Sequence, residues 1–383
     1  MSVEIVPVRT KAEREAFLRL PWRIYRDDPR WVPNLLLLQR DVISEKKNPF
    51  FDHGEAQLFL ARRDGEVLSR VSAQVDRRHN EQHGERTGFF GLFESVDDAA
   101  AARALLGAAE DWLRQRGMDC IRGPFSLSID EEVGLMVEGF DQPPMIATTY
   151  APPYYQGLVE GAGYAKAIDL LAFRWQMEEP PARMLPAIER TRAVPGLRVR
   201  PINMRRLRQE VDLLLDIYNE AWQDNWGYVR VSQRAARKLA SDLRLIADPR
   251  MVLIAEVNGE PAGMVAGLPN LYEAIRDFRG FIDPWKALKL LWRLKVRGTE
   301  TGRVFIFGVK PKFGTRELHG LPYLLLYELY RAALTRRYKW CEESWVLESN
   351  ARMIAILPHW NAYAYKRYRI FEKALRQGSG QAL

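Results

Sequence analysis

The sequence predicts an α/β fold that occurs twice, as two tandem copies of one unit. A repeated hairpin signal is the first observation: Asp64-Gly65 joins two strand-like runs, and Asn258-Gly259 does the same 258 − 64 = 194 positions later. Both dipeptides favour a tight turn between antiparallel strands. The second observation is that the two cysteines, Cys120 and Cys341, follow similar short segments, and the third is that both halves show the same order of helical and extended patterns. A single repeat at a period of roughly 190 residues indicates a duplicated domain rather than a solenoid.

In the first copy, local signals mark the ends of the expected elements. Asp97-Asp98 precedes a helical run and supplies a capping carboxylate, and Gly117 follows that run as a C-terminal stop. Pro152-Pro153 suits the first turn of a short helix. The expected helices are 11–19, 99–116 and a short one from 152, and the expected strands are 56–62, 67–76, 87–94, 120–122 and 167–175.

The second copy repeats this order. Its expected helices are 205–222, 323–336 and 350–357, and its expected strands are 252–257, 261–268, 304–309, 340–348 and 365–372. Between the copies, the proline-rich stretch 177–195 is typical of a linker. We therefore expect an N-terminal domain at 1–178, a linker at 179–196, a C-terminal domain at 197–375 and a disordered tail at 376–383.

The spacing between matching features changes along the chain. The hairpins are offset by 194 positions, the cysteines by 341 − 120 = 221, and Gly163 and His359 by 359 − 163 = 196. The second copy therefore has about 27 extra residues before its strand at 304, and the first copy has about 25 extra residues after Cys120. These two insertions are where we expect the copies to have specialised.

Composition narrows the class of protein and its partners. The chain has 383 residues, of which 47% are hydrophobic and 28% charged, as in a soluble globular protein, and its net charge of +8 suits an anionic partner. Two cysteines give no disulfide framework and fit a reducing cytosol. No basic-then-apolar segment follows Met1, and no apolar run reaches the length of a membrane span. We expect a cytoplasmic protein, or one bound to the inner face of the membrane.

The order helix, hairpin, strand, helix, strand, helix, strand resembles the GNAT superfamily of acyl-CoA-dependent acyltransferases. Val309-Lys310-Pro311 resembles the Val-x-Pro that ends the family's fourth strand, and 344–350 resembles its fifth strand running into an Asn before a helix. The resemblance implies a mixed sheet that opens between its fourth and fifth strands. The acyl donor then lies in the opening, with its pyrophosphate on backbone amides of the following helix. The expected fold class is therefore two tandem GNAT-like α/β domains, each with a mixed sheet.

The loop after the fourth strand differs between the copies. In the second copy it is basic and contains glycines, which the resemblance identifies as a phosphate cradle, whereas 93–98 in the first copy is acidic and would repel a pyrophosphate. We therefore expect the donor in the C-terminal domain, while the N-terminal domain shapes the acceptor site or is structural. The expected donor-binding residues are Val309, Lys310, Lys312, Arg316, Gly320 and Asn350. The alternative is a solvated basic loop.

The insertion of the first copy, 123–151, and its neighbours gather glycines, aromatics and carboxylates, which is typical of a site lining. Acyl transfer to an amine requires a neutral amine, so a positioned Glu or Tyr serves as base or acid. The candidates are Glu131, Glu132, Tyr155 and, from the second copy, Glu348. The family often carries a Tyr acid on the helix after the fifth strand, and 350–357 contains none. The alternative is a solvated acidic loop with core aromatics.

The insertion of the second copy, 281–297, predicts an amphipathic helix. Its basic face comprises Lys286, Lys289, Arg293 and Arg297, and its broad apolar arc comprises Trp285, Leu288, Leu291, Trp292 and Leu294. Such a helix fits an interfacial membrane anchor that attracts anionic lipid. The alternative is a helix docked on its own protein through the apolar stripe.

Other chemistry has weaker signals. His79 and His83 would share a helical face, but no third ligand lies nearby, so we expect no metal. Cys341 has no histidine close in sequence, and we expect it in the core. The positive charge is spread along the chain, which argues against nucleic acid as a partner.

Two GNAT-like copies with a Trp-rich insertion resemble the group that includes bacterial ceramide synthases. That resemblance implies transfer of a fatty acyl group from acyl-CoA, or from acyl carrier protein, to the amine of a long-chain sphingoid base at the membrane surface. One alternative is an N-acyltransferase with a soluble amine acceptor. The other is an acyl-CoA-binding protein without catalysis.

Overall fold

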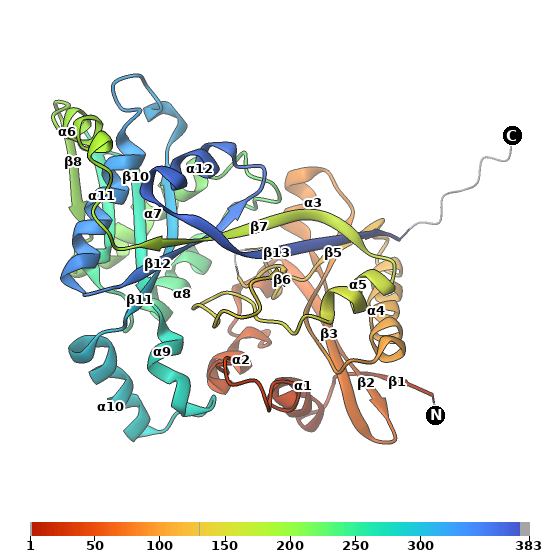
Figure 1. Cartoon of the computed structure of the whole chain (residues 1–383). Coiled ribbons are helices and arrows are strands. Elements are labelled where there is room, and N and C mark those ends of the chain that lie inside the picture. Colours follow the sequence, from red (N-terminus) through yellow and green to blue (C-terminus); the bar gives the residue numbers. More distant parts are fainter. Residues whose placement is uncertain (1, 130, 376–383) are drawn as a thin grey trace, which may run out of the picture. The chain divides into compact units, whose positions relative to one another are not determined.

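The computed structural model describes residues 2–129 and 131–375, and the chain divides into two compact units (Figure 1). Unit 1 comprises Met1–Leu170, Arg279–Phe281 and the segment that begins at Lys366, and unit 2 comprises Leu171–Phe278 and Ile282–Tyr365. Neither unit is therefore one continuous stretch of chain. The tail that the sequence predicts to be disordered, 376–383, lies outside the described residues.

Unit 1 contains a mixed sheet with the strand order β1-β2-β3-β4-β5-β13, and β6 also pairs with β13. Only β4 and β5 are parallel among these described pairs; the others are antiparallel. Its elements in chain order are β1 Glu4–Pro7, α1 Lys11–Ile24, α2 Leu36–Val42, β2 Gly54–Arg63, β3 Glu66–Asp76, α3 Arg77–His83, β4 Thr87–Ser95, α4 Ala99–Arg114, β5 Cys120–Gly123, β6 Leu135–Glu138, α5 Tyr155–Gly161 and β7 Ala165–Gln176, which continues into unit 2.

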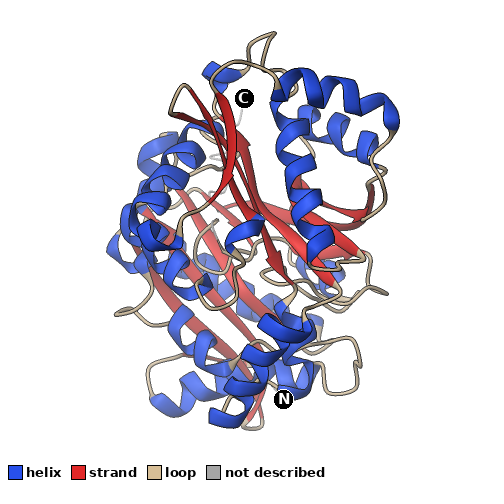
Figure 2. Cartoon of the chain, turned by 90° about the vertical axis from the view of Figure 1, so that its left-hand side faces the viewer, coloured by secondary structure: helices blue, strands red, loops and turns tan. Residues whose placement is uncertain are grey.

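The strands of unit 2 follow one another in the order β7-β12-β11-β10-β9-β8, and β11 and β12 are parallel. Helices lie beside the strands in both units (Figure 2). Its elements are α6 Leu185–Arg192, β8 Leu197–Pro201, α7 Leu207–Ala221, α8 Gln233–Leu243, β9 Val252–Val257, β10 Glu260–Pro269, α9 Leu271–Ile275, α10 Pro284–Trp292, β11 Thr301–Val309, α11 Leu321–Thr335, β12 Trp340–Leu347, α12 Ala351–Ile356 and the start of β13 Tyr363–Ala374.

The two hairpin turns confirm the predicted repeat. Asp64 and Gly65 have φ of 52° and 81°, and Asn258 and Gly259 have φ of 51° and 82°. Positive φ at both central residues is the backbone of the tight turn that matches strand twist, and Asp, Asn and Gly tolerate it best. The same local chemistry therefore builds the same hairpin, β2–β3 in unit 1 and β9–β10 in unit 2.

The cysteines, by contrast, do not occupy matching positions. The amide of Asp119 donates to the carbonyl of Arg86, and the amide of Lys339 donates to the carbonyl of Glu300 in the same role. Cys120 therefore corresponds to Trp340, and the predicted pairing of Cys120 with Cys341 is off by one residue. The register of the parallel strands agrees, because Thr87 faces Cys120 whereas Thr301 faces Trp340.

The segment 179–196, for which we expect a linker, contains helix α6. Ile188 on this helix is fully buried and lies in the same core as Leu321 and Leu325 of α11. Thus α6 covers part of α11 inside unit 2. Its one proline, Pro186, lies in its first turn, where a missing N–H costs nothing.

The last strand, β13, begins in unit 2, and from Lys366 onward it belongs to unit 1. It pairs antiparallel with β5, so that Phe371 faces Gly123 and Ala374 faces Cys120. The buried carboxylate of Asp169 accepts hydrogen bonds from Arg369 at 2.8 Å and from Arg367 at 3.1 Å. The sequence pattern assigned this strand to the second copy, since strand pairing between distant segments leaves no local signal.

Asp169 predicts a pH-dependent contribution to the stability of unit 1. Burial alone would raise the pKa of this carboxyl, but hydrogen bonds from Arg369 and Lys166 lower it below its ordinary value. A depressed folded-state pKa stabilises the fold above the unfolded value of about 3.9, and this contribution is lost as the pH falls below it. We expect Asp169→Asn to lower the free energy of unfolding by about 1–3 kcal/mol at neutral pH, measured by urea denaturation, and by less near pH 3.

Asp111→Asn is the matched control, because Asp111 also pairs with an arginine but its side chain is 70% exposed. Asp111→Asn should lower the free energy of unfolding by no more than about 0.5 kcal/mol. Equal losses in the two variants at pH 7 would show that the cluster around Asp169 does not hold β13 in place.

Candidate functional site

In unit 2, β11 and β12 pair over a short distance and then continue separately. The parallel register runs from Thr301 opposite Trp340 to Val304 opposite Glu343. Beyond it, β11 extends to Val309, which faces Gly263 on β10, and β12 extends to Leu347. This is the place at which the GNAT resemblance implies an opening for the acyl donor.

The lysine at the start of the following loop is already neutralised by the protein. Lys310 is 2% exposed, and its Nζ donates to Asp216 at 2.5 Å and to Glu220 at 2.8 Å. Burial lowers its pKa, but the two carboxylates more than offset this and raise it. Lys310 therefore links the end of β11 to α7. We predicted that it binds a phosphate, but in the structure its ammonium group binds two carboxylates of the protein.

The other loop residues remain accessible at the start of α11. Lys312 is half-exposed and pairs with Glu260, and Arg316 is exposed. Gly320 is the N-cap of α11 and makes no side-chain cap, so the first amides of this helix are not capped by a side chain. A Cβ at Gly320 would lie 2.1 Å from Oγ1 of Thr191, so only glycine fits there. A helix N-terminus with nearby cations is suited to an anion.

Three further predicted residues lie on the same strands and turns of unit 2. Val309 is the last residue of β11 and packs partly buried against the core under α11. Asn350 caps α12, since its side chain accepts from the amide of Met353 at 3.1 Å. Glu348 lies in the turn after β12 and is partly buried.

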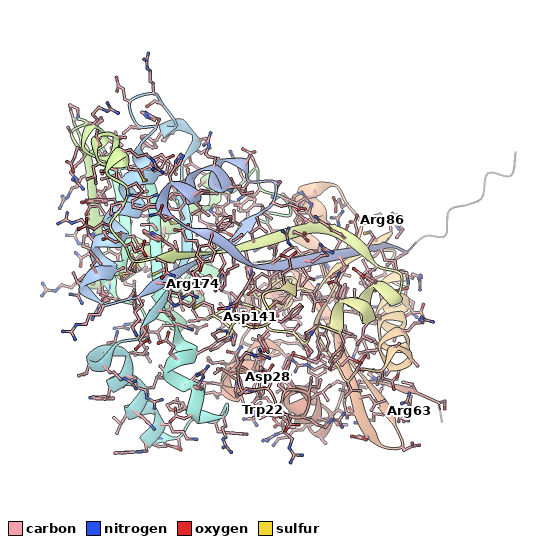
Figure 3. All side chains as sticks on the ribbon, in the orientation of Figure 1. Trp22, Asp28, Arg63, Arg86, Asp141 and Arg174 are labelled. Atoms are coloured by element: carbon pink, nitrogen blue, oxygen red, sulfur yellow. The ribbon has the colours of Figure 1, made fainter. Side chains whose placement is uncertain are left out.

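In unit 1, the corresponding helix start is already capped by a carboxylate. Asp98 accepts hydrogen bonds from the amides of Ala100 at 3.1 Å and Ala101 at 2.9 Å. It also pairs with Arg63, the last residue of β2, at 2.5 Å; Arg63 is labelled in Figure 3. The hydrogen bond from Arg63 lowers the pKa of Asp98. The N-terminus of α4 is thus filled by an anion of the protein itself.

The insertion of unit 1 also occupies the free edge of β4. The amide of Phe125 donates to the carbonyl of Phe90 at 2.8 Å, and Gln74 donates to the carbonyl of Phe125 at 3.0 Å. A Cβ at Gly91 would lie 1.4 Å from that same carbonyl, so the backbone crosses directly over β4. Phe125 and Leu127 are at most 2% exposed. In unit 1, the chain itself fills the place that corresponds to the donor opening.

Tyr155 belongs to a buried polar network in unit 1. Its hydroxyl donates to Glu94 at 2.8 Å and accepts from the amide of Ser95 at 2.8 Å, and Tyr25 donates to the same carboxylate at 2.8 Å. Arg70 lies 3.6 Å from Glu94. Burial raises the pKa of Glu94 and raises that of Tyr155 well above 10. The partners of these groups all belong to unit 1, as expected for a polar network that stabilises the fold.

The two acidic candidates of the insertion lie beside this network with amide partners. Asn48 donates to Glu131 at 3.1 Å, and Asn34 donates to Glu132 at 3.2 Å. Glu132 is also close enough to Arg70 to influence its pKa. Just after α1, Asp28, which is labelled in Figure 3, accepts a hydrogen bond from Tyr150 at 2.5 Å. Unit 1 therefore brings together Glu132 and Tyr155, while Glu348 belongs to unit 2.

The sequence reasoning missed several buried polar side chains. Glu94 in unit 1 and Arg303, Glu342 and Ser344 in unit 2 are all inside strands and at most partly exposed. Charged residues within an apolar strand pattern could have indicated these positions. A charged residue is rarely buried unless it has a partner, so such a residue predicts a buried polar contact. The acidic pair Glu342-Glu343 within β12 is the clearest example.

Metal and thiol chemistry receive no support from the described residues. No group of three or more His, Cys, Asp and Glu suited to a metal occurs among them. The rings of His79 and His83 lie 4.5 Å apart, and burial lowers the pKa of His79. Burial raises the pKa of Cys341 to about 12, so its thiol is protonated at neutral pH.

Helix α10 presents its apolar side to solvent. Trp285 is 75% exposed, Leu288 60% and Trp292 53%. The basic side faces the protein instead, because Lys289 and Arg293 both pair with Asp277. A helix docked on its own protein through its apolar stripe would have the opposite orientation, so the structure does not fit that alternative. None of the described helices is both long and apolar enough to span a membrane.

Comparison with known proteins gives close relatives in sequence. The chain is 42% identical over 380 residues to the bacterial ceramide synthase of Caulobacter vibrioides, covering 98% of each chain. It is 38% identical over 368 residues to protein YghO of Escherichia coli, covering 95% of this chain and 94% of that one. No protein-family model matches the chain.

Solved structures support the fold. A tandem GNAT protein from the clavulanic acid biosynthesis pathway matches with a TM-score of 0.58 and 14% identity, covering 99% of this chain and 100% of that one. A GCN5-related N-acetyltransferase from Sphaerobacter thermophilus matches with a TM-score of 0.54 and 15% identity, covering 98% and 96%. These matches confirm the predicted tandem GNAT fold, and the sequence relatives establish that the chain belongs to the family of the bacterial ceramide synthase.

Proposed function

We propose that this protein is an N-acyltransferase that moves a fatty acyl group from acyl-CoA to the amine of a long-chain sphingoid base. The observation that carries the proposal is the 42% identity to a bacterial ceramide synthase over nearly the full length of both chains. The tandem GNAT fold supports it, because the fold matches N-acetyltransferases. A thioester on acyl carrier protein would present the same reacting group, with a different anionic carrier.

We infer that the donor binds in unit 2 and that each chain binds one donor. Lys312 and Arg316, both exposed in the loop before α11, offer cationic groups to a pyrophosphate. In unit 1, Asp98 already caps the equivalent helix, and the backbone of Phe125 covers β4. Of these two loops, the one in unit 2 carries the exposed positive charges, and this supports the assignment of the donor to unit 2.

We propose that α10 attaches the protein to the membrane surface from which the lipid substrates come. Its exposed tryptophans and leucine form an apolar strip, and tryptophan prefers the boundary between water and lipid. Lys295 and Arg297 next to this strip are exposed and would attract anionic lipid. An interfacial helix needs no membrane-spanning segment, and we propose that it attaches the protein to the cytoplasmic face of the membrane.

The proposed reaction predicts equal amounts of two products. Purified protein given a long-chain acyl-CoA and sphinganine should release free thiol and form an N-acyl amide in a 1:1 ratio, measured with a thiol-reactive dye and by mass spectrometry. Amide formation with soluble amines but with no long-chain amine would contradict the lipid acceptor. Tight acyl-CoA binding without thiol release would contradict catalysis altogether.

The loop before α11 predicts a loss of donor affinity when its cations are removed. We expect Arg316→Ala and Lys312→Ala each to raise the KM for acyl-CoA about tenfold, since a hydrogen bond to a charged group contributes about 1.5–3 kcal/mol. Lys339→Ala is the control, because Lys339 is an exposed lysine of unit 2 outside this loop. Calorimetry should give one acyl-CoA per chain, and two would contradict the assignment to unit 2.

The exposed strip of α10 predicts lipid binding that depends on its tryptophans. Wild-type protein should float with vesicles containing anionic lipid, and Trp285→Ala and Trp292→Ala should each weaken binding about tenfold, from about 1.5–3 kcal/mol per buried side chain. Leu245→Ala, at a residue 64% exposed elsewhere in unit 2, should leave binding unchanged. Failure of the wild-type protein to float would contradict the membrane proposal.

A further inference from the structure

A row of polar side chains lies on the face of the unit 2 sheet opposite to α11. Val304 of β11 and Cys341 of β12 belong to the hydrophobic core that contains the leucines of α11. Successive side chains of a strand point to opposite faces, so Arg303 and Glu342 project to the other side. They are register partners on neighbouring strands.

These side chains form one hydrogen-bonded chain that ends at a tyrosine. The hydroxyl of Tyr365 donates to Oε2 of Glu342, and the hydroxyl of Ser344 donates to Oε1 of the same carboxylate at 2.5 Å. Nε of Arg303 donates to Oγ of Ser344 at 2.9 Å, and its Nη2 donates to the carbonyl of Ser344 at 2.9 Å. Glu342 is fully buried, and Arg303 is 2% exposed, whereas Tyr365 is partly exposed. The chain therefore runs from a buried arginine to a more accessible hydroxyl.

This chain of groups lies where β11 and β12 part. Arg303 opposite Glu342 is the rung before the last described pair, and Ser344 is the first residue of β12 beyond that pair. Aromatic rings hold both ends, since Arg303 lies 4.9 Å from the ring centroid of Trp345 and Tyr365 packs edge-on against Trp340 at 5.9 Å. The polar groups thus lie between aromatic rings, at the place where the GNAT resemblance implies the opening for the acyl donor.

The first copy provides a comparison within the same chain. Thr87-Gly88 and Thr301-Gly302 are equivalent, so Phe89 takes the place of Arg303, and Arg122, which faces Phe89, takes the place of Glu342. Arg122 pairs instead with Glu85 and Glu372. The hydrogen-bonded chain is therefore present in unit 2, which has the basic loop. In unit 1, where the backbone at Phe125 covers the edge of β4, other residues stand at the equivalent positions.

We propose that Tyr365 is a catalytic residue of the acyl transfer and that Glu342, held by Ser344 and Arg303, positions it and exchanges protons with it. The inference rests on the proposed function. The neutral amine nitrogen attacks the thioester carbon, so that the C–N bond forms and the C–S bond breaks. The nitrogen passes one proton to the hydroxyl of Tyr365 as that hydroxyl passes its own proton to the buried Glu342. Tyr365 then gives a proton to the departing thiolate, and Glu342 returns its proton to Tyr365. The products are the amide and the free thiol, and the enzyme regains its starting state.

Replacement of the hydroxyl tests this role directly. Tyr365→Phe should lower kcat with acyl-CoA about 100-fold or more, with the KM for acyl-CoA and the thermal midpoint unchanged. Glu342→Gln should lower kcat less, since it keeps a hydrogen-bond partner for Tyr365. Tyr363→Phe is the matched control on the same strand, because Tyr363 is 50% exposed, and it should behave as wild type.

A change of leaving group separates catalysis from structure. An acyl ester of 4-nitrothiophenol releases a thiolate that needs no proton, so the deficit of Tyr365→Phe should shrink to less than about threefold with this donor, whereas a structural defect would persist. An active wild type with a Tyr365→Phe kcat within threefold on acyl-CoA would overturn the inference alone. Wild-type protein that releases no thiol with any amine would overturn the proposed function and the inference together.

Discussion

Short parallel pairing between β11 and β12 is the constraint on which the candidate site depends. Four paired residues on each strand hold the strands together at one end, and both strands continue beyond that point. The continuation of β11 leads directly into the loop with Lys312 and Arg316, and the continuation of β12 carries Ser344. The basic loop and the hydrogen-bonded side chains of Arg303, Glu342 and Ser344 are thereby fixed to the same two strands. Strands position such groups more rigidly than loops do.

The duplication explains why one copy can specialise at the expense of the other. Unit 1 retains the hairpin, the short parallel pairing of β4 with β5 and the long helix after β4. It differs in what occupies the edge of β4, where the backbone at Phe125 and the network around Glu94 and Tyr155 close the space. Unit 1 keeps a packed core, and its buried carboxylate at Glu94 accepts hydrogen bonds from Tyr25 and Tyr155.

Local chemistry made much of the fold predictable. The hairpins follow from Asp64-Gly65 and Asn258-Gly259, and α4 begins at its predicted cap, Asp98. The tandem GNAT fold followed from the order of such elements. Non-local facts were not predictable: a strand pattern at 365–372 does not reveal its partner, and helical spacing in α10 does not reveal that Asp277 would hold the basic side inward. Lys310 was chosen for its charge, but two acidic residues of α7, about 90 positions away along the chain, determine what that charge contacts.

The position of β13 has a consequence for how the protein is made. Unit 1 is synthesised almost entirely before unit 2, yet its sheet needs the last strand of the chain. Between Leu170 and Lys366 the ribosome must add 366 − 170 = 196 residues, which takes on the order of 10–40 s at bacterial rates of roughly 5–20 residues per second. During that interval the edge of β5 is unpaired in the nascent chain, because β13 has not been synthesised. Asp169 likewise lacks Arg367 and Arg369. Unpaired strand edges invite association with other chains, so the N-terminal half is the part most in need of chaperones and is the last to become native.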